Sequence, residues 1–119
     1  MRVAATILAI LVAAAPCAAQ ETANGTGTVL RALDKIAGVT RDVELPAGAT
    51  ARFGRLEVDN AQCRYPVGNP SGDAFALLRV RESGRDAPVF TGWMIASAPG
   101  LNPLDHQRYD VWVLRCTTS

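Results

Sequence analysis

The stretch Val39-Thr40-Arg41-Asp42-Val43-Glu44-Leu45 alternates apolar and polar residues. Strict alternation is typical of a half-buried β-strand, because successive side chains point to opposite faces of a sheet. Residues 46–48 (Pro-Ala-Gly) predict a turn, residues 49–53 a short strand and residues 54–55 a tight link. Residues 56–63 then alternate again. Short strands joined by tight turns predict an antiparallel, β-rich fold.

Further strands are expected on both sides of this stretch. Apolar segments bounded by glycine and proline cover residues 29–34, 74–81, 88–95 and 109–116. Since 74–81 and 88–95 are separated only by a short connection, they predict a hairpin. Residues 97–108 are irregular in pattern. The only helix that they suggest is one turn at 104–108. About seven short strands predict a single all-β domain, either a small antiparallel β-sandwich or a barrel.

The N-terminus has the organisation of a secretory signal peptide over residues 1–19. A basic start, Met1-Arg2, is followed by an apolar run at 3–15 and by small residues. The run is too short to span a membrane, which takes about 20 apolar residues. We expect cleavage after Ala19 and export to the periplasm. The alternative is a lipid-modified Cys17, but Pro16 stands where a lipoprotein signal needs a small residue.

Two cysteines, Cys63 and Cys116, lie beyond this junction. In an oxidising compartment they predict a disulfide bond, which joins its two strands either as sheet neighbours or across the core. The alternation of residues 56–63 puts Val58 and Cys63 on opposite faces. Either a β-bulge near Asn60 reverses the register, or Cys63 points away from the main core.

The exported chain, residues 20–119, suits one domain. Residues 20–28 are polar and glycine-bearing, so we expect a flexible lead before a domain at 29–119. The whole chain has 12 basic and 11 acidic residues, and loss of Arg2 with the leader balances them. A balanced, scattered charge argues against nucleic acid or an anionic membrane surface as the main partner.

Residues 89–99, followed by His106 and residues 109–116, resemble a bacterial family called domain of unknown function 2155. Residues 33–38, the turn at 53–56 and Cys63 are similar to it as well. The resemblance implies an exported protein, mainly of alphaproteobacteria, with no assigned function and no catalytic residues to carry over. It also implies a periplasmic location.

Aromatic residues gather near the C-terminus. Burial in the core is the simpler interpretation of Trp93 and Trp112, because large aromatic side chains dominate the core of a small domain. The alternative is an exposed aromatic patch that binds a partner. Gly92 favours a bulge or a close backbone approach beside Trp93. The residues that we expect to form a binding region are Phe90, Trp93, Met94, His106, Tyr109 and Trp112.

His106 is the only histidine. With acidic neighbours it could act as an acid–base group, whereas the simpler interpretation is a loop histidine hydrogen-bonded to backbone. Ser97 is a candidate nucleophile only by proximity in sequence, and no nucleophile elbow is present. We expect no metal site, since one histidine and two bonded cysteines do not provide three ligands. No cofactor motif is present either.

These observations favour an exported, periplasmic, non-catalytic β-domain. We expect it to bind another envelope protein, as an accessory module of an inner-membrane complex. A second hypothesis is a small-ligand binder with a pocket between the sheets, lined by the same aromatic residues. A third is a small hydrolase that uses His106. No transmembrane segment is expected after the leader, and the oligomeric state is not predicted.

Overall fold

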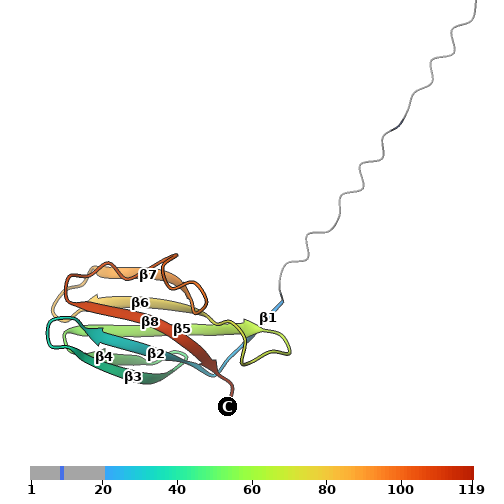
Figure 1. Ribbon diagram of the computed structural model, residues 1–119, viewed down its shortest axis with the longest axis horizontal. Coiled ribbons are helices and arrows are strands. Elements are labelled where there is room, and N and C mark those ends of the chain that lie inside the picture. The colour runs from blue at the N-terminus through green and yellow to red at the C-terminus, as the bar shows by residue number, and fades with distance from the viewer. Residues whose placement is uncertain (1–8, 10–20) are drawn as a thin grey trace, which may run out of the picture.

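The computed structural model describes Ala9 and residues 21–119. Within them the chain forms eight β-strands and no helix (Figure 1). The all-β prediction is therefore confirmed. Residues 1–8 and 10–20, which include most of the expected signal peptide and its cleavage point, lie outside the described residues. The strands are β1 (Thr22–Asn24), β2 (Gly27–Asp34), β3 (Val39–Pro46), β4 (Thr50–Phe53), β5 (Leu56–Pro66), β6 (Phe75–Glu82), β7 (Pro88–Ile95) and β8 (Tyr109–Thr117).

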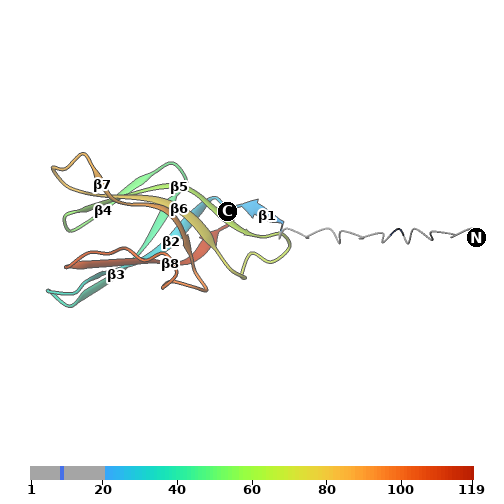
Figure 2. The ribbon, with the colours of Figure 1, turned by 90° about the horizontal axis from the view of Figure 1, so that it is seen from above.

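The strands form two antiparallel sheets that pack face to face. The larger sheet has the order β1-β5-β6-β7, with β4 also paired to β5, and the smaller has the order β3-β2-β8. Figure 2 views the two layers edge-on. No strand ladder joins the sheets anywhere in the described part of the chain. The architecture is therefore a sandwich and not a barrel, and β6 and β7 form the expected hairpin.

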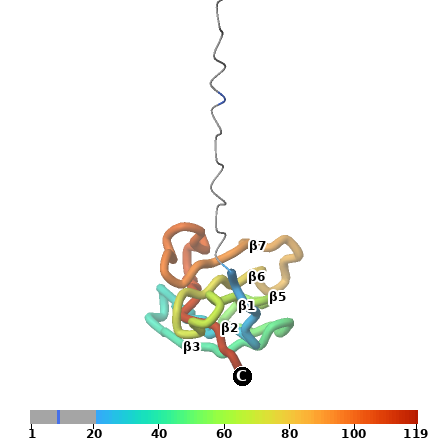
Figure 3. The backbone as a smooth tube through the Cα atoms, turned by 90° about the vertical axis from the view of Figure 1, so that its right-hand side faces the viewer, coloured from blue at the N-terminus to red at the C-terminus, as the bar shows by residue number. Residues whose placement is uncertain are grey.

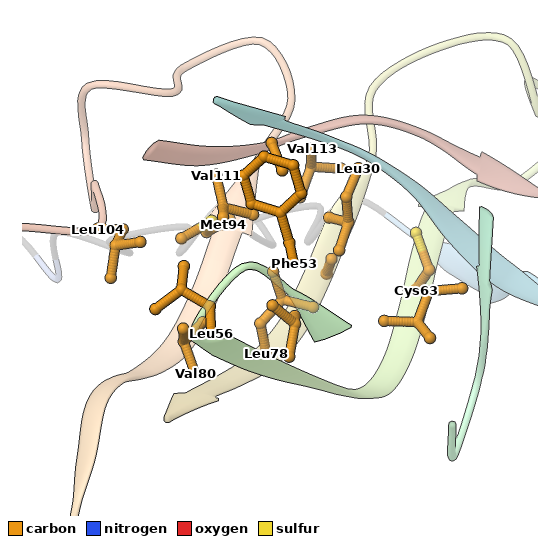
Figure 4. Close-up of a cluster of buried hydrophobic side chains, with 14 of the residues drawn as sticks. Leu30, Phe53, Leu56, Cys63, Leu78, Val80, Met94, Leu104, Val111 and Val113 are labelled. Carbon is orange, nitrogen blue, oxygen red and sulfur yellow. The ribbon is translucent and has the colours of Figure 1, made fainter. Parts of the chain in front are cut away.

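The core lies between the two sheets (Figure 4). Leu56, Leu78 and Val80 of the larger sheet cluster with Leu30 and Val113 of the smaller, and each is at most 2% exposed. Burial of such a side chain contributes about 1.5–3 kcal/mol to stability. Along β6, buried residues that face the core alternate with more exposed ones.

The strand expected at 39–45 is β3, but little of it is buried. Only Leu45 enters the core, and Val39 is 52% exposed. β3 is an edge strand of the smaller sheet, and its charged side chains suit such a position, where a neighbour is absent on one side.

A β-bulge interrupts β5 between Asn60 and Gln62. Before the bulge Val58 faces the core, and after it Cys63 does, with no exposed surface. The extra residue, Ala61, is exposed. Of the two alternatives for this strand, the bulge is confirmed, since one added residue exchanges the two faces of a strand.

Cys63 on β5 and Cys116 on β8 form the predicted disulfide. The two strands belong to different sheets, so the bond crosses the core and does not join sheet neighbours. It lies near the end of the sandwich where β1 and the C-terminus come together, which Figure 3 shows from outside.

The expectation of a flexible lead up to residue 28 is wrong from Thr22 onward. β1 pairs with the end of β5, and β2 begins at Gly27. Between them the Gly25 N–H donates to the Cys63 carbonyl at 2.7 Å. A Cβ on Gly25 would lie 2.6 Å from the Thr117 carbonyl oxygen. Only glycine therefore fits where the chain passes from β1 in one sheet to β2 in the other. These partners are distant in sequence, and a local pattern does not reveal them.

Residues 96–108 connect β7, an edge of the larger sheet, to β8, an edge of the smaller. The helical turn expected at 104–108 is absent. Leu104 is instead buried in the core and ties the connection to it. The Asn102 side chain donates to the Trp93 carbonyl at 2.9 Å. The connection therefore covers part of an open sheet edge, where free backbone groups would otherwise invite pairing.

We expect the disulfide to provide a large part of the stability. The double change Cys63→Ala and Cys116→Ala should lower the free energy of unfolding by about 4 kcal/mol, because a cross-link between residues 53 positions apart restricts the unfolded chain. Urea unfolding followed by tryptophan fluorescence measures this. Reduction of the wild-type protein should give a similar loss, and an unchanged midpoint in both experiments would contradict the prediction.

Candidate functional site

The outer face of the larger sheet carries apolar side chains that the core does not use. Because Met94 points into the core, alternation turns its neighbours on β7 outward. Phe75 pairs with Ile95 and Leu77 pairs with Trp93 across β6 and β7. We call these four residues the outer patch. Trp93 is 38% exposed, and the other three are partly exposed.

A shallow depression of about 320 Å³ borders the outer patch and is lined by Thr22, Arg64, Phe75 and Trp93. The Arg64 guanidinium donates to the Thr22 hydroxyl at 2.7 Å, to the Asn24 side-chain oxygen at 2.8 Å and to the Thr22 carbonyl at 3.0 Å. These acceptors are neutral. Arg64 therefore holds β1 against β5 and keeps a positive charge at the border of the outer patch.

Farther along the same face the charges are paired. Arg81 lies 3.4 Å from Glu57 and 3.1 Å from Asp59, and Arg52 lies 2.8 Å from Glu57. Thr50 donates its hydroxyl to Asp59 at 2.6 Å. This hydrogen bond, with that from Arg81, holds the pKa of Asp59 below its usual range against the opposing effect of burial. One half of the face is thus apolar and the other is a set of ion pairs.

Trp93 and Trp112 do not form one aromatic patch. Val111 and Val113 point into the core, so Trp112 between them faces the outer side of the smaller sheet. Trp93 faces the outer side of the larger sheet, in the opposite direction. Trp112 is half-buried beside a depression of about 330 Å³ formed with the β7–β8 connection. The region expected from sequence is therefore divided between two faces.

Three other residues of the expected binding region lie in the core or against it. Met94 and Tyr109 belong to the core, and Phe90 packs against it. Gly92 has a φ of +152°, and a Cβ there would lie 3.1 Å from the Asn102 side-chain nitrogen. The close approach that this glycine indicated comes from the chain's own connection. Since both tryptophans point outward, they do not line a pocket between the sheets.

His106 fastens the β7–β8 connection at one end of the sandwich. Its Nδ1 accepts the backbone N–H groups of Arg108, at 3.0 Å, and Tyr109, at 3.1 Å. This network assigns the ring hydrogen to Nε2, which donates to the Glu82 carboxylate. The hydrogen bond lowers the pKa of Glu82. Lys35 donates to the His106 carbonyl at 2.7 Å. Both ring nitrogens therefore serve structural contacts.

Ser97 does not pair with His106 through any hydrogen bond. Its hydroxyl and its backbone N–H both donate to Asp73, at 2.5 and 2.9 Å.

In Ala9 and residues 21–119, no three histidine, cysteine, aspartate or glutamate side chains gather so as to hold a metal ion. The same residues contain no helix that is long and apolar enough to cross a bilayer.

Tyr109 closes the same end of the sandwich from inside. Its hydroxyl accepts the backbone N–H of Arg55 at 3.1 Å, and its ring meets Phe53 edge-on, with centroids 5.9 Å apart. Gly54, with a φ of +56°, leaves room for this contact, since a Cβ there would lie 2.5 Å from the hydroxyl oxygen. Tyr109 is thus a packing residue, and its position explains why glycine stands at residue 54.

Sequence reasoning found Trp93 but not its companions in the outer patch, nor Arg64 at its border. One signal was present, because residues 74–78 are apolar at every position. A strand buried on one face leaves every second side chain exposed, so such a run places apolar groups on both faces. Phe75 and Leu77 are the members of that run that face outward.

Comparison with known proteins gives a family without an assigned activity. Residues 28–116 match the model of a family described as an uncharacterized protein conserved in bacteria (DUF2155). The chain is also similar to an uncharacterized protein of Rickettsia prowazekii, with 26% identity over 96 residues, which are 78% of this chain and 62% of the relative. It thus spans less than two thirds of that relative. No solved structure matches the chain.

An ion pair near His106 predicts a pH dependence of stability. Arg108 donates to the Asp34 carboxylate at 3.0 and 3.2 Å. The backbone N–H groups of Ile36 and Ala37 also donate to Oδ1 of Asp34, each at 3.0 Å. The hydrogen bond from Arg108, followed by that from Ala37, lowers the pKa of Asp34 in the folded state. The resulting stabilisation is complete above the unfolded-state pKa and is lost as the pH falls through the folded-state pKa.

Asp34→Asn should keep the two backbone hydrogen bonds and lose the ion pair. Between about pH 6 and pH 3 the variant should therefore lose less stability than the wild type does. The urea midpoint measured across this range tests the prediction. Asp86→Asn, at an exposed position between β6 and β7, is the control and should follow the wild-type slope. Parallel slopes for the wild type and Asp34→Asn would show that this ion pair does not contribute.

Proposed function

The chain belongs to the DUF2155 family of bacterial proteins, and we propose that it is an exported periplasmic domain that binds a partner protein of the cell envelope without itself being a catalyst. The outer patch is the binding surface. In the envelope, such a domain acts as an accessory module of an inner-membrane complex.

The exposed Trp93 carries this proposal. Trp93, which does not belong to the core, is 38% exposed and pairs with Leu77 in an apolar group on a sheet face. Exposed tryptophan loses little conformational entropy on binding and is enriched among the residues that dominate the energy of protein interfaces. Contiguous apolar surface on a soluble domain marks an interaction site more often than isolated apolar residues do.

The contacts of His106 support a non-catalytic role. A general base needs a ring nitrogen that can take a proton from a substrate. In His106 one nitrogen accepts two backbone N–H groups, and the other donates to Glu82. Its side chain is 13% exposed. The hydrolase hypothesis therefore lacks a free base at its only histidine.

Export is supported by the leader-like residues 1–19 and by the Cys63–Cys116 bond, since disulfides persist in oxidising compartments such as the periplasm. We expect protein isolated from the periplasmic fraction of the bacterium to begin at Gln20. Intact-mass spectrometry under non-reducing conditions should give the mass of residues 20–119 less two hydrogens. An uncleaved N-terminus, a lipid attached to Cys17 or two free thiols would contradict export in this form.

Photo-crosslinking tests the binding surface. A photoreactive phenylalanine analogue in place of Thr91, exposed on the outer face beside the patch, should give a discrete protein adduct in intact cells. The matched control carries the analogue at Thr40, which is exposed on the outer face of the smaller sheet. The control should give no such adduct. Equal yields from both positions, or an adduct from Thr40 alone, would contradict the proposed surface.

Trp93→Ser, added to the Thr91 analogue, should reduce the adduct at least about tenfold, because a dominant interface residue is worth about 2 kcal/mol or more. Since Trp93 lies outside the core, the urea midpoint of the purified variant should stay near that of the wild type. Trp112→Ser is the matched tryptophan control and should leave the adduct in place. An undiminished adduct in the folded Trp93→Ser protein would remove Trp93 from the interface.

A further inference from the structure

We propose that the partner segment bound at the outer patch is acidic: its apolar side chain lies on Trp93 and Leu77, and carboxylates on either side of it pair with Arg64 and Arg79. This inference rests on the proposed function, since it names the chemistry of the partner at the same surface. It follows from how the charges of this face are arranged.

The acidic residues of the face are already neutralised. Glu57 contacts both Arg52 and Arg81, and Asp59 accepts hydrogen bonds from Thr50 and Arg81. Two acidic residues are shared by two arginines, so these four side chains have no net charge to offer a partner. Two further arginines, Arg64 and Arg79, then give the whole face a positive charge.

Neither of these two arginines has a carboxylate partner within salt-bridge distance in residues 21–119. Arg64 donates only to neutral oxygens of Thr22 and Asn24. Arg79 is exposed and pairs with Asp59 across β5 and β6, and its charge helps to lower the pKa of Asp59. No salt bridge joins the two, because the Asp59 carboxylate is bonded to Thr50 and Arg81. Arg64 therefore has no carboxylate within salt-bridge distance, and the carboxylate beside Arg79 is bonded to other groups. A partner carboxylate can pair with either arginine.

The two arginines lie in different cross-strand rows of the sheet, on either side of the Leu77–Trp93 pair. Arg64 pairs with Phe75 across β5 and β6, whereas Arg79 pairs with Thr91 across β6 and β7. The Leu77–Trp93 pair lies between these rows. Four residues along β6 separate the rows of Arg64 and Arg79, which is about 13–14 Å along a strand. An extended partner segment with two carboxylates four residues apart and an apolar residue midway between them fits this spacing.

The surface is also hollowed on both sides of the Leu77–Trp93 pair. One depression lies at Arg64 and Phe75. The other, of about 400 Å³, lies over Leu77, Arg79 and Thr91 and is also lined by Asp59, whose carboxylate is bonded to Thr50 and Arg81. Both depressions are lined mainly by apolar surface, with an arginine at the border. Each can therefore accept part of a side chain next to a cation, which suits the stem and carboxylate of a glutamate.

A second copy of this chain is a poorer occupant. Stacking two outer patches about a two-fold axis would bring the arginines of both copies together, and like charges across an interface are unfavourable. An anionic membrane is also a poorer occupant, because two acidic residues share this face and each basic residue near such a surface contributes only about 1 kcal/mol. A protein segment of opposite charge remains as the occupant that the observations favour.

A display library of random dodecapeptides, selected on the full exported chain, tests the inference. Peptides enriched on the wild type should carry two acidic residues four positions apart around an apolar residue. Arg79→Glu should weaken their binding at least about tenfold, as expected for a charge pair at the centre of an interface. Arg64 is unsuitable for this test because it also holds β1. Arg115→Glu makes the same charge change at an exposed position of β8 and should alter binding less than about twofold.

The outcomes separate the two levels of the proposal. Enriched peptides that are neutral or basic, and whose binding is abolished by Trp93→Ser, would overturn the acidic partner and leave the binding surface in place. Enriched peptides whose binding survives Trp93→Ser would remove the surface itself. Failure of any peptide to enrich on the wild type would overturn this inference, as would binding to phosphatidylglycerol vesicles that Arg79→Glu abolishes.

Discussion

The bulge in β5 is the constraint on which the arrangement of both faces depends. Val58 and Cys63 are an odd number of positions apart, so in a regular strand they would point to opposite faces. The added residue between Asn60 and Gln62 turns both of them inward. The same change turns Arg64 outward, beside Phe75. The disulfide across the core and the positive border of the outer patch therefore have one structural origin.

The disulfide end of the sandwich also organises the N-terminal segment. Gly25 crosses from the larger sheet to the smaller, bonded to the Cys63 carbonyl and in contact with Cys116. On the outer face of β5, the Arg64 side chain bonds to Thr22 and Asn24 and so holds β1 in place. From Thr22 onward, the segment after the expected cleavage point is thus part of the fold. At the opposite end, His106, Tyr109 and Arg108 fasten the chain as it enters β8.

Most aromatic residues of the protein serve packing. Phe53 and Tyr109 meet inside the core, Phe90 lies against it, and Trp112 is half-buried beside the connection from β7. Trp93 differs because the connection bonds only its carbonyl and leaves its side chain exposed. The proposed interaction surface leaves the core intact, since the residues that form it alternate with those that fill the interior.

The sequence by itself determined the all-β class, the β6–β7 hairpin and the cysteine pairing. It also placed seven of the eight strands, all but β1, near their observed bounds. These depend on periodicity, on turn residues and on the presence of two cysteines after the leader-like segment, all of which can be recognised along the chain. Only the tertiary structure decided between sandwich and barrel, ordered residues 22–28, placed the bulge at Ala61 and separated Trp93 from Trp112. Those outcomes depend on contacts between residues far apart in the chain, such as Gly25 with Cys63, and on which of two sheets a strand joins. Closeness in sequence placed the two tryptophans in one region, and the packing of two sheets turned them to opposite sides.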